Sequence, residues 1–497
     1  MKRPLVRLAA CISLAAVTAV GFVAVPGAGA ATQGGKMSTF LTVGPKAKPA
    51  SAKAAPGYLL FTCQLGETPG FVCYDPYQMR NAYGTTSLIN QGYDGTGKTI
   101  VIVDAFQAPA VRADLAAFDS WYGLPAPNFS IISPNGTVPF NPNDPVQYSW
   151  TQEITLDVEW AHAIAPGAKI VLDLAKTSDD SDILSATKYA VDNHLGDVIS
   201  QSFGENESCV EPSTLAAEHQ VFVQATRENI TLVASSGDQG ASQQTCDGNS
   251  WVQAVSSPAS DPLVTSVGGT ELHAADYCFA VLGCDPNSNP PAGTYLSETA
   301  WNEFDSESTG GGYSTLYNEP PYQKGTINGG NQRAVPDVAY NAAIYHGVLV
   351  FYDTPGIYQP GDSGTYLFGG TSCGSPQWSA LVAIADQMAG HDLGFINTAL
   401  YHIAQSPPKY GADFHDVTSG NNSVVETDSN GNPVSVSGFN AGPGWDPTTG
   451  LGSPVANNLI PQLIQTWSPG DATAVIAGTN PHGNGHQSNK PGKVHPH

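Results

Sequence analysis

Residues 98–106 read KTIVIVDAF and residues 168–175 read AKIVLDLA, and these two stretches decide the fold class. Both contain a short run of valine, isoleucine and leucine, which is typical of strands covered by helices on both faces. A helical pattern occupies about residues 149–163 between them. Strand, helix and strand in this order predict one βαβ unit of a parallel sheet.

The alternation continues beyond this unit. A helical pattern near 180–194 leads to DVISQSFG at 197–204, and a further helix leads to TLVASSGD at 231–238. We therefore expect an α/β fold with a central, mostly parallel sheet in a single large domain. Ligands of such sheets gather at the carboxyl ends of the strands. The polar residues expected there are Asp104, Ser202 and Asp238.

The two ends of the chain differ from this pattern. Residues 1–30 combine a basic start, an apolar stretch and the triplet Ala28-Gly29-Ala30, which predicts a cleaved signal peptide and a secreted protein. A membrane anchor is the alternative, but Pro26-Gly27 closes the apolar run early, and no later segment looks able to span a bilayer. We expect a flexible leader or short propeptide over 31–57, the folded domain over 58–468 and a disordered tail over 469–497.

The cysteines agree with export. Removing Cys11 with the signal peptide leaves seven, of which six fall in locally paired positions. Disulfides are common in exported proteins, whereas no Cys/His cluster here has the spacing of a zinc site. The expected disulfides are Cys63–Cys73, Cys209–Cys246 and Cys278–Cys284, which leaves Cys373 free.

The chain is strongly acidic. Its 43 aspartate and glutamate residues against 19 lysine and arginine residues give a formal net charge of −24. Such a surface repels phosphates, so we expect no nucleic-acid partner. The scarcity of lysine and arginine also limits the positive charge that remains once the carboxylates are protonated, which predicts tolerance of acid.

A second stretch, GGTSCGSPQWSALVAIADQ at 369–387, puts Ser372 just before a helix expected to begin at Pro376. Free backbone N–H groups and the helix dipole favour negative charge there, as on a serine nucleophile. A serine that only caps the helix is the alternative. As a nucleophile, Ser372 needs a base, because a serine hydroxyl alone reacts poorly.

Two of three possible catalytic arrangements lack convincing partners. G-x-S-x-G at 370–374 fits a nucleophile elbow, which requires an acid and then a histidine later in the chain. The candidate acids and histidines later in the chain all fall within a short stretch of sequence, and none is flanked by a clear strand-end loop. They are Asp386, Asp413, His391, His402 and His415. Asp362-Ser363-Gly364-Thr365 looks like an aspartic-protease triplet, but no second triplet exists to share a proton, so a turn is preferred.

The third arrangement uses the helical pattern within YSWTQEITLDVEWAHAIAPGAKI at 148–170. Glu153 and Asp157 are four residues apart and share one helix face. Carboxylate pairs at this spacing are commonly solvated, but apolar neighbours leave little of this helix for solvent. We therefore expect a buried carboxyl pair with an elevated pKa.

Several further strings occur in a fixed order along the chain. They are YDP at 74–76, Met79-Arg80, Tyr83-Gly84, E-x-x-x-D at 153–157, APGA at 165–168, SQSFG at 200–204, SSGD at 235–238, SVGGT at 266–270, GGGYS at 310–314, VPDVAYNA at 335–342, GGTSxxSP at 369–376 and GWDPTTGLGSP at 444–454. In this order and spacing they resemble the sedolisins, the serine-carboxyl peptidases, over nearly the whole mature chain.

The resemblance implies a subtilisin-like, three-layer α/β fold in which a carboxylate replaces the usual catalytic histidine. Ser372 is then the nucleophile, Glu153 the general base and Asp157 the residue that orients it. Asp238 serves the oxyanion hole, where it must be protonated to donate a hydrogen bond. An acidic optimum follows, because the base is ionised while the donor is not. Asp104 is at least as well explained by loop capping and is left out of this set.

The resemblance also implies a calcium ion. DV at 416–417 and G-x-G-W-D at 442–446 match the family's late calcium loop, and calcium prefers oxygen ligands. A simple glycine turn is the alternative. The implied ligands are the carboxylates of Asp416 and Asp446 and the backbone carbonyls of Val417, Gly442 and Gly444.

The implied partners are protein or peptide substrates, paired with the backbone along Ser202-Phe203-Gly204 and the GGGYS segment. We expect a monomeric, secreted endopeptidase or exopeptidase. The alternative is a secreted protein that binds peptides on the same calcium-stabilised scaffold without cutting them.

The leader departs from the pattern of the sedolisins. Sedolisins usually have a large folded prosegment, whereas only residues 31–73 separate the expected cleavage site from Tyr74.

Overall fold

The computed structural model describes residues 35–55, 58–277, 290–327, 330–353 and 364–478. Its centre is an eight-stranded sheet with the strand order β16, β15, β11, β9, β6, β8, β7, in which β21 also pairs with β15. The bounds are β6 Thr99–Ala105, β7 Asn128–Ile132, β8 Lys169–Ala175, β9 Val198–Gln201, β11 Thr231–Ser235, β15 Thr265–Ala274, β16 Tyr295–Ala300 and β21 Val338–Asn341. All neighbours pair in parallel except β15 and β16. The mostly parallel α/β sheet expected from the sequence is confirmed.

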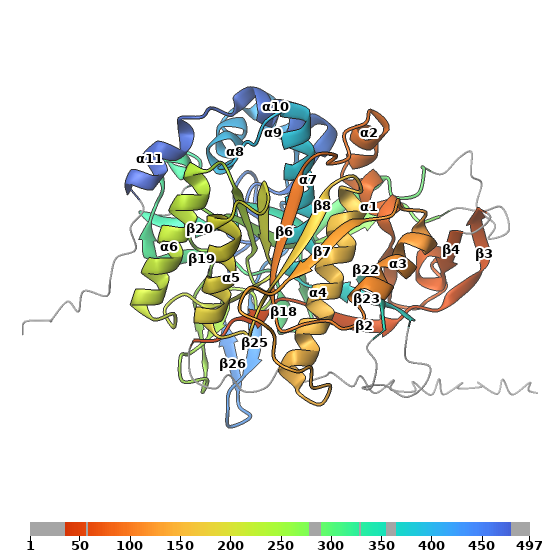
Figure 1. Cartoon of the computed structure of the whole chain (residues 1–497), viewed down its shortest axis with the longest axis horizontal. Helices are drawn as coiled ribbons and strands as arrows, with labels where there is room; N and C mark the ends of the chain where they lie inside the picture. Colours follow the sequence, from red (N-terminus) through yellow and green to blue (C-terminus); the bar gives the residue numbers. More distant parts are fainter. Residues whose placement is uncertain (1–34, 56–57, 278–289, 328–329, 354–363, 479–497) are drawn as a thin grey trace, which may run out of the picture.

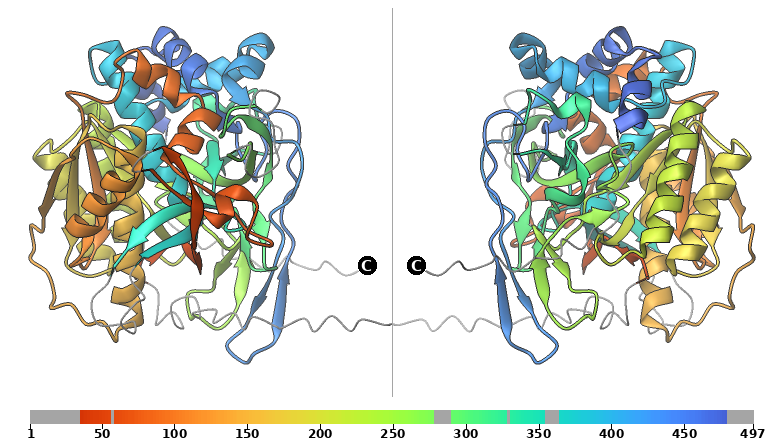
Figure 2. Two further views of the ribbon diagram at one scale, coloured as in Figure 1. Left: turned by 90° about the vertical axis from the view of Figure 1, so that its right-hand side faces the viewer. Right: turned by 90° about the vertical axis from the view of Figure 1, so that its left-hand side faces the viewer.

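Helices cover the sheet and complete a three-layer arrangement (Figures 1 and 2). Helices α4 (Pro145–Ile164) and α7 (Gly374–Ala389) pack against each other and against β6. Helices α5 (Asp180–Asp192) and α6 (Pro212–Arg227) pack against each other, with α5 on β8 and α6 on β11. Six consecutive residues of β6, from Ile100 to Ala105, are buried, which is why its sequence shows no alternation.

Helix α4 is enclosed by the rest of the protein. Pro145 occupies its first turn, and the Asp144 side chain accepts a hydrogen bond from the backbone N–H of Val146. Every residue from Trp150 to Ile164 is buried. A helix covered on all sides places its polar residues in the protein interior, and here these include two carboxyl groups one turn apart.

Smaller elements surround this framework. A four-stranded sheet has the order β2 (Thr42–Lys46), β23 (Gly364–Gly369), β22 (His346–Tyr352), β5 (Val72–Tyr74), and a three-stranded sheet has the order β1 (Ser38–Thr39), β10 (Phe203–Asn206), β14 (Ser256–Ser257). The remaining helices are α1 Pro76–Ala82, α2 Thr85–Asn90, α3 Val111–Tyr122, α8 Asn397–Ala404, α9 Pro407–Asp413, α10 Ala456–Thr466 and α11 Asp471–Gly478. Strand β3 (Pro49–Ala55) pairs with β4 (Tyr58–Phe61), and β25 (Val424–Thr427) pairs with β26 (Pro433–Val436).

Two expectations about the ends of the chain need correction. The sequence predicts a flexible leader or short propeptide over 31–57, but β1, β2 and β3 lie within this segment, because β10, β23 and β4 supply backbone partners. The folded part of the chain therefore begins before residue 58. Helix α11 likewise lies at the start of the expected tail over 469–497, where Val475 is buried. The expected signal peptide over 1–30 and residues 479–497 lie outside the described residues.

The expected cysteine pattern is found wherever the structure describes it. Cys63–Cys73 and Cys209–Cys246 are disulfide-bonded, and Cys373 is free and buried. Burial raises the pKa of the Cys373 thiol well above its ordinary value, so this sulfur stays protonated beside Ser372. The expected pair Cys278–Cys284 lies outside the described residues.

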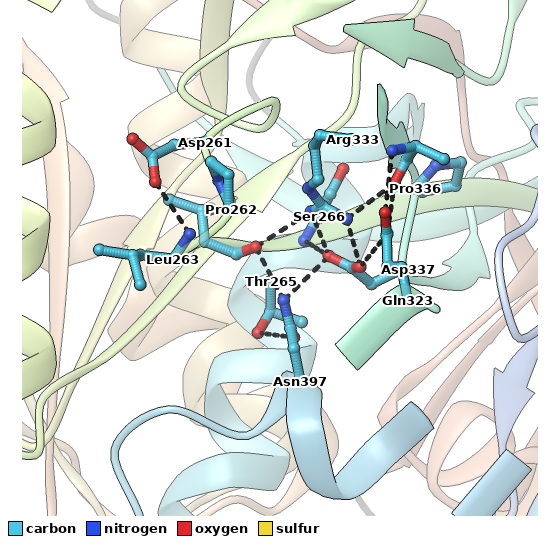
Figure 3. A network of polar contacts seen from close by, with 12 residues as sticks. Asp261, Pro262, Leu263, Thr265, Ser266, Gln323, Arg333, Pro336, Asp337 and Asn397 are labelled. Atoms are coloured by element: carbon cyan, nitrogen blue, oxygen red, sulfur yellow. Dashed lines mark hydrogen bonds and ion pairs between the residues drawn. The ribbon is translucent and has the colours of Figure 1, made fainter. Parts of the chain in front are cut away.

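A buried ion pair fixes the edge of the central sheet (Figure 3). Both terminal nitrogens of Arg333 donate to Asp337, each at 2.6 Å, and neither side chain reaches solvent. Asp337 also accepts from the backbone N–H of Ser266 on β15 and from the amide of Asn397 on α8. Because its hydrogen-bonding capacity is largely satisfied, this pair offsets the cost of burying two charges.

Candidate active site

Ser372 lies in a 3₁₀ turn, Thr371–Cys373, between strand β23 and helix α7. The turn begins at Gly370, whose φ of 102° is readily adopted only by glycine. A Cβ atom at Gly370 would overlap both Oδ2 of Asp238 and the backbone carbonyl of Phe40. The Gly-Gly-Thr-Ser string therefore keeps space open on one side of the serine.

The backbone and side chain of Ser372 have different partners. The N–H donates to the backbone carbonyl of Phe40 at 2.9 Å. The hydroxyl donates to the backbone carbonyl of Ser202, at the carboxyl end of β9, at 3.4 Å. Ser372 is completely buried by the chain around it. The helix-capping alternative is wrong, since α7 begins without a side-chain cap.

Helix α4 brings Glu153 and Asp157 to this serine. Both carboxyl groups are fully buried. Burial, followed by the charges of Asp157 and Asp104, raises the pKa of Glu153 well above its ordinary value, while the nearby Ser372 hydroxyl lowers it. Burial raises the pKa of Asp157 to about 8, although Ser202 and Glu153 act to lower it. The buried carboxyl pair expected from the sequence is confirmed.

Glu153 and Ser372 are neighbours without a well-formed hydrogen bond in this state. Neither oxygen of Glu153 has a hydrogen-bond partner among the described residues, and the same holds for Asp157. The serine hydroxyl instead points to Ser202. A rotation of one side chain is therefore needed to join the expected nucleophile to its expected base, an adjustment that is common in enzymes without substrate.

Asp238 follows β11 and lies on the other side of the serine. Its Oδ1 accepts from the backbone N–H of Thr371 at 2.7 Å and from the Thr371 hydroxyl at 2.8 Å. Its Oδ2 is buried and has no partner among the described residues. Burial raises the pKa of Asp238 well above its ordinary value, the Thr371 bonds lower it, and Glu307 raises it further. This shift favours the neutral form of the carboxyl.

Asp104, left out of the expected site, belongs beside it. Both of its oxygens are buried and have no hydrogen-bond partner among the described residues, so it caps no loop. Burial and the charge of Asp157 raise the pKa of Asp104 well above its ordinary value. Its position at the end of a buried strand was the only sequence signal that could have identified it.

The comparisons with known proteins agree with this geometry. Residues 136–400 match the model of the subtilase family. The chain belongs to the subtilase family. Among its relatives, kumamolisin from Bacillus sp. (strain MN-32) is 33% identical over 80% of this chain and 64% of its own length. Sedolisin from Pseudomonas sp. (strain 101) is 31% identical over 71% of this chain and 56% of its own length. The chain thus spans less than two thirds of either relative.

A solved structure supports the same assignment. Pseudomonas sedolisin complexed with two molecules of pseudo-iodotyrostatin matches this chain with a TM-score of 0.64 and 28% identity. The match covers 79% of this chain and 98% of that one. The sedolisin resemblance seen in the sequence and the subtilisin-like fold are therefore confirmed.

The histidines considered as alternative bases lie elsewhere in this subtilase. His391 packs against Trp467, and His415 stacks on Tyr295 at 3.5 Å between ring centres. Asp386 is on α7, fourteen positions beyond Ser372, or about 21 Å at 1.5 Å per residue. The Ser372 hydroxyl contacts the Ser202 carbonyl and none of the candidate histidines, so the nucleophile-elbow arrangement is not assembled. Asp362, of the aspartic-protease alternative, lies outside the described residues.

Asp416 and Asp446, the expected calcium carboxylates, hold the same glycine loop. The Gly444 N–H donates to both oxygens of Asp416, at 3.1 and 3.2 Å, and the Gly442 N–H donates to Asp446 at 3.1 Å. Asp416 is exposed, whereas Asp446 and Val417 are buried. Two carboxylates around one loop fit a hard cation that takes oxygen ligands. Asp446 also accepts from Thr448 and Thr449, so the loop is ordered by hydrogen bonds as well.

One further group of ligand-type side chains was not anticipated. Glu271 and His273 point to the same side of β15, and His346 reaches them from β22. His346 contacts Glu271 at 2.9 Å, and the two histidine rings lie 4.4 Å apart. Sequence spacing could not reveal this group because the third member comes from another strand. Each of the three side chains offers one ligand atom, and these atoms all lie within 4.8 Å of one another.

Buried carboxyl groups make the stability of this subtilase dependent on pH. Besides the active-site carboxyls, burial raises the pKa of Asp114 to about 8, of Asp173 to about 7 and of Asp386 to about 8. In the unfolded chain such groups titrate near pH 4. The folded state then binds protons more tightly, so the stabilisation is complete below about pH 4 and is lost as pH rises through 7 to 8.

We therefore predict that the protein unfolds at a lower temperature at pH 8 than at pH 4, by about 5 °C or more. Differential scanning calorimetry on Ser372→Ala measures this without self-digestion. A melting temperature that is unchanged or higher at pH 8 contradicts the assignment of protonated interior carboxyls.

Proposed function

We propose that this chain is an acid-active serine peptidase that hydrolyses peptide bonds in proteins or peptides. The observation that supports it is the position of Ser372 between a buried carboxyl pair on α4 and the unpaired Oδ2 of Asp238. We further propose that it works outside the cell, which the signal-like start and the two disulfides favour, and that it acts as a monomer. Within the described ranges, every helix is too short or too polar to cross a bilayer.

The first step begins with a rotation of the Ser372 hydroxyl from the Ser202 carbonyl towards Glu153. Glu153, ionised, takes the proton as Oγ attacks the carbonyl carbon of the substrate. Asp157, one helical turn away, holds the Glu153 carboxyl in place and shares its proton. The proton then passes from Glu153 to the leaving amine, and water repeats the sequence to release the acyl group.

The oxyanion that develops during attack needs donors. We propose two: the backbone N–H of Ser372 and the protonated Oδ2 of Asp238. The Thr371 donors occupy Oδ1 of Asp238, so the proton of the neutral acid is left on Oδ2, the oxygen without a partner. A neutral acid donates here, whereas an ionised carboxylate would repel the oxyanion.

The peptidase proposal is tested by digestion of a denatured protein at several acidic pH values. Wild-type protein should cleave it, whereas Ser372→Ala and Glu153→Gln should lose about a thousandfold or more in kcat. Glu159→Gln is the matched control, because Glu159 is a buried carboxyl on the same helix that accepts from the backbone of Phe351. It should retain activity within a few fold.

Absence of cleavage by the folded wild-type protein, with tight binding of the same peptides, would instead support the peptide-binding alternative. The fragments produced also distinguish an endopeptidase from an exopeptidase, since only the former releases internal segments of many lengths.

The role of Asp238 is tested by two substitutions that should differ in the activity they retain. Asp238→Ala removes the donor and should lower kcat by about two to three orders of magnitude. Asp238→Asn should retain more activity, because the Thr371 donors hold the amide oxygen and so direct its NH₂ towards the oxyanion. Wild-type activity should fall as pH rises through the raised pKa of Asp238, whereas Asp238→Asn should lose this alkaline limb. Identical alkaline limbs would exclude the role.

We also propose a structural calcium ion in the loop of Asp416 and Asp446, with the carbonyls of Val417, Gly442 and Gly444 as further ligands. The ion would neutralise two carboxylates that share one loop. Removal of calcium with a chelator at neutral pH should lower the melting temperature, and calcium should restore it. Asp416→Asn should abolish this response while the fold persists. An unchanged melting temperature after chelation would remove the site.

A further inference from the structure

The side chains of Glu271, His273 and His346 direct three ligand atoms towards one point of the protein. Oε1 of Glu271 lies 2.9 Å from Nδ1 of His346 and 3.5 Å from Nε2 of His273. A four-coordinate zinc ion, with bonds of about 2.1 Å to nitrogen and oxygen, separates its ligand atoms by about 3.4 Å. Because all three ligand atoms already lie within 4.8 Å of one another, small side-chain rotations are enough to bring them to a single ion.

Hydrogen bonding alone explains this group poorly. Although Glu271 is only 2.9 Å away, the buried Nδ1 of His346 has no hydrogen-bond partner among the described residues, so the angle between the two groups does not suit a hydrogen bond. The two imidazole rings lie edge to face, 4.4 Å apart, and a nitrogen of each faces the same carboxylate oxygen. Two protonated histidines at this distance would repel each other, whereas a cation between neutral rings attracts both nitrogens and the carboxylate.

The backbone that carries the three ligands is fixed by two buried residues, Asn341 and Tyr74. Asn341 accepts from the backbone N–H of Leu272, the residue between the two ligands of β15, at 2.9 Å, and donates to the carbonyl of His346 at 2.8 Å. The Tyr74 hydroxyl donates to the Leu272 carbonyl at 2.8 Å, and the Tyr74 ring stacks on His346. The ligands are therefore held in position by their surroundings, as a binding site requires.

An ion can reach this group from solvent. The exposed fraction of the side chain rises from 17% for His346 through 24% for Glu271 to 40% for His273. The side on which His273 lies is therefore open to entry of an ion, and water is available there to complete its coordination.

We propose that Glu271, His273 and His346 bind a divalent transition-metal ion of the zinc type, with water as the remaining ligand. Two imidazoles and one carboxylate suit zinc, copper or nickel, whereas calcium takes oxygen ligands. The site thus differs in chemistry from the proposed calcium loop of Asp416 and Asp446, and it does not depend on the peptidase function proposed above.

The ion would join two sheets of the protein. Glu271 and His273 belong to β15 of the central sheet, whereas His346 begins β22 of the four-stranded sheet. Residues 275–345 connect these strands along the chain, so the three ligands come together only in the folded state, and an ion bound there stabilises that state. Since β22 pairs with β23, the strand that precedes the turn of Ser372, the ion would also hold the framework of the candidate active site.

The test is titration of Zn²⁺ into the full chain at neutral pH, where the histidines are not protonated, measured by isothermal titration calorimetry. Ser372→Ala serves as the parent, so that no peptidase activity can degrade the sample. A chelator first removes bound metals, and calcium is then returned in excess. The parent should bind Zn²⁺, and addition of His273→Ala to it should weaken the tightest binding about tenfold or more.

His402→Ala in the same parent is the matched control, because His402 is an exposed histidine outside the group. It should leave the affinity for Zn²⁺ unchanged. The four histidines beyond residue 478 add the same background to every variant, so the comparison between variants isolates the proposed site.

Thermal unfolding provides a second measurement. Zn²⁺ should raise the melting temperature of the parent by about 2 °C or more. The His273→Ala variant should lose this response and yet melt like the parent without Zn²⁺, since its altered side chain is the most exposed of the three ligands. Equal affinity for Zn²⁺ in the parent and in the His273→Ala variant would overturn the inference, because the ion would then be bound elsewhere. A parent that binds no Zn²⁺ would overturn it as well.

Discussion

Burial of carboxyl groups without a cationic partner is the constraint on which this active site depends. Helix α4 is enclosed on all sides, so the carboxyl groups of Glu153 and Asp157 are surrounded by protein instead of water. The charges that act on Glu153 are those of Asp157, Asp104 and Asp238, all of them carboxyls. A buried cluster of carboxyl groups can be stable only when it retains protons that solvated carboxylates would lose. The chemistry proposed here, in which one acid is a base and another a donor, requires that shared protonation.

The sheet and the main site residues could be predicted because each has a local signal. Continuous apolar runs such as Ile100–Val103 identify strands covered on both faces. A carboxyl pair at four-residue spacing among apolar neighbours identifies a buried helix face, and Ser372 precedes a helix that begins with small residues and proline. These signals require no knowledge of how distant segments meet. The motif strings also show where along the chain each site residue falls, which is why Asp238 could be predicted as a site residue.

What the sequence could not predict depends on contacts between distant segments. Strand β1 has two residues and no periodicity, and it is a strand only because β10 offers an edge. The role of Asp104 depends on whether its oxygens meet donors, which a strand-end position does not reveal. The Glu271, His273 and His346 group requires β22 to lie beside β15. In each case the deciding partner is far away in the chain.

Strand β2 has a consequence for how the site is assembled. It pairs with β23, the strand that leads directly into the turn of Ser372. Without β2, this edge of β23 would lose its backbone partner, and β22 alone would remain paired with it. Completion of the site therefore requires contact between two segments that are far apart in the sequence, and closure of such long-range contacts is slow during folding.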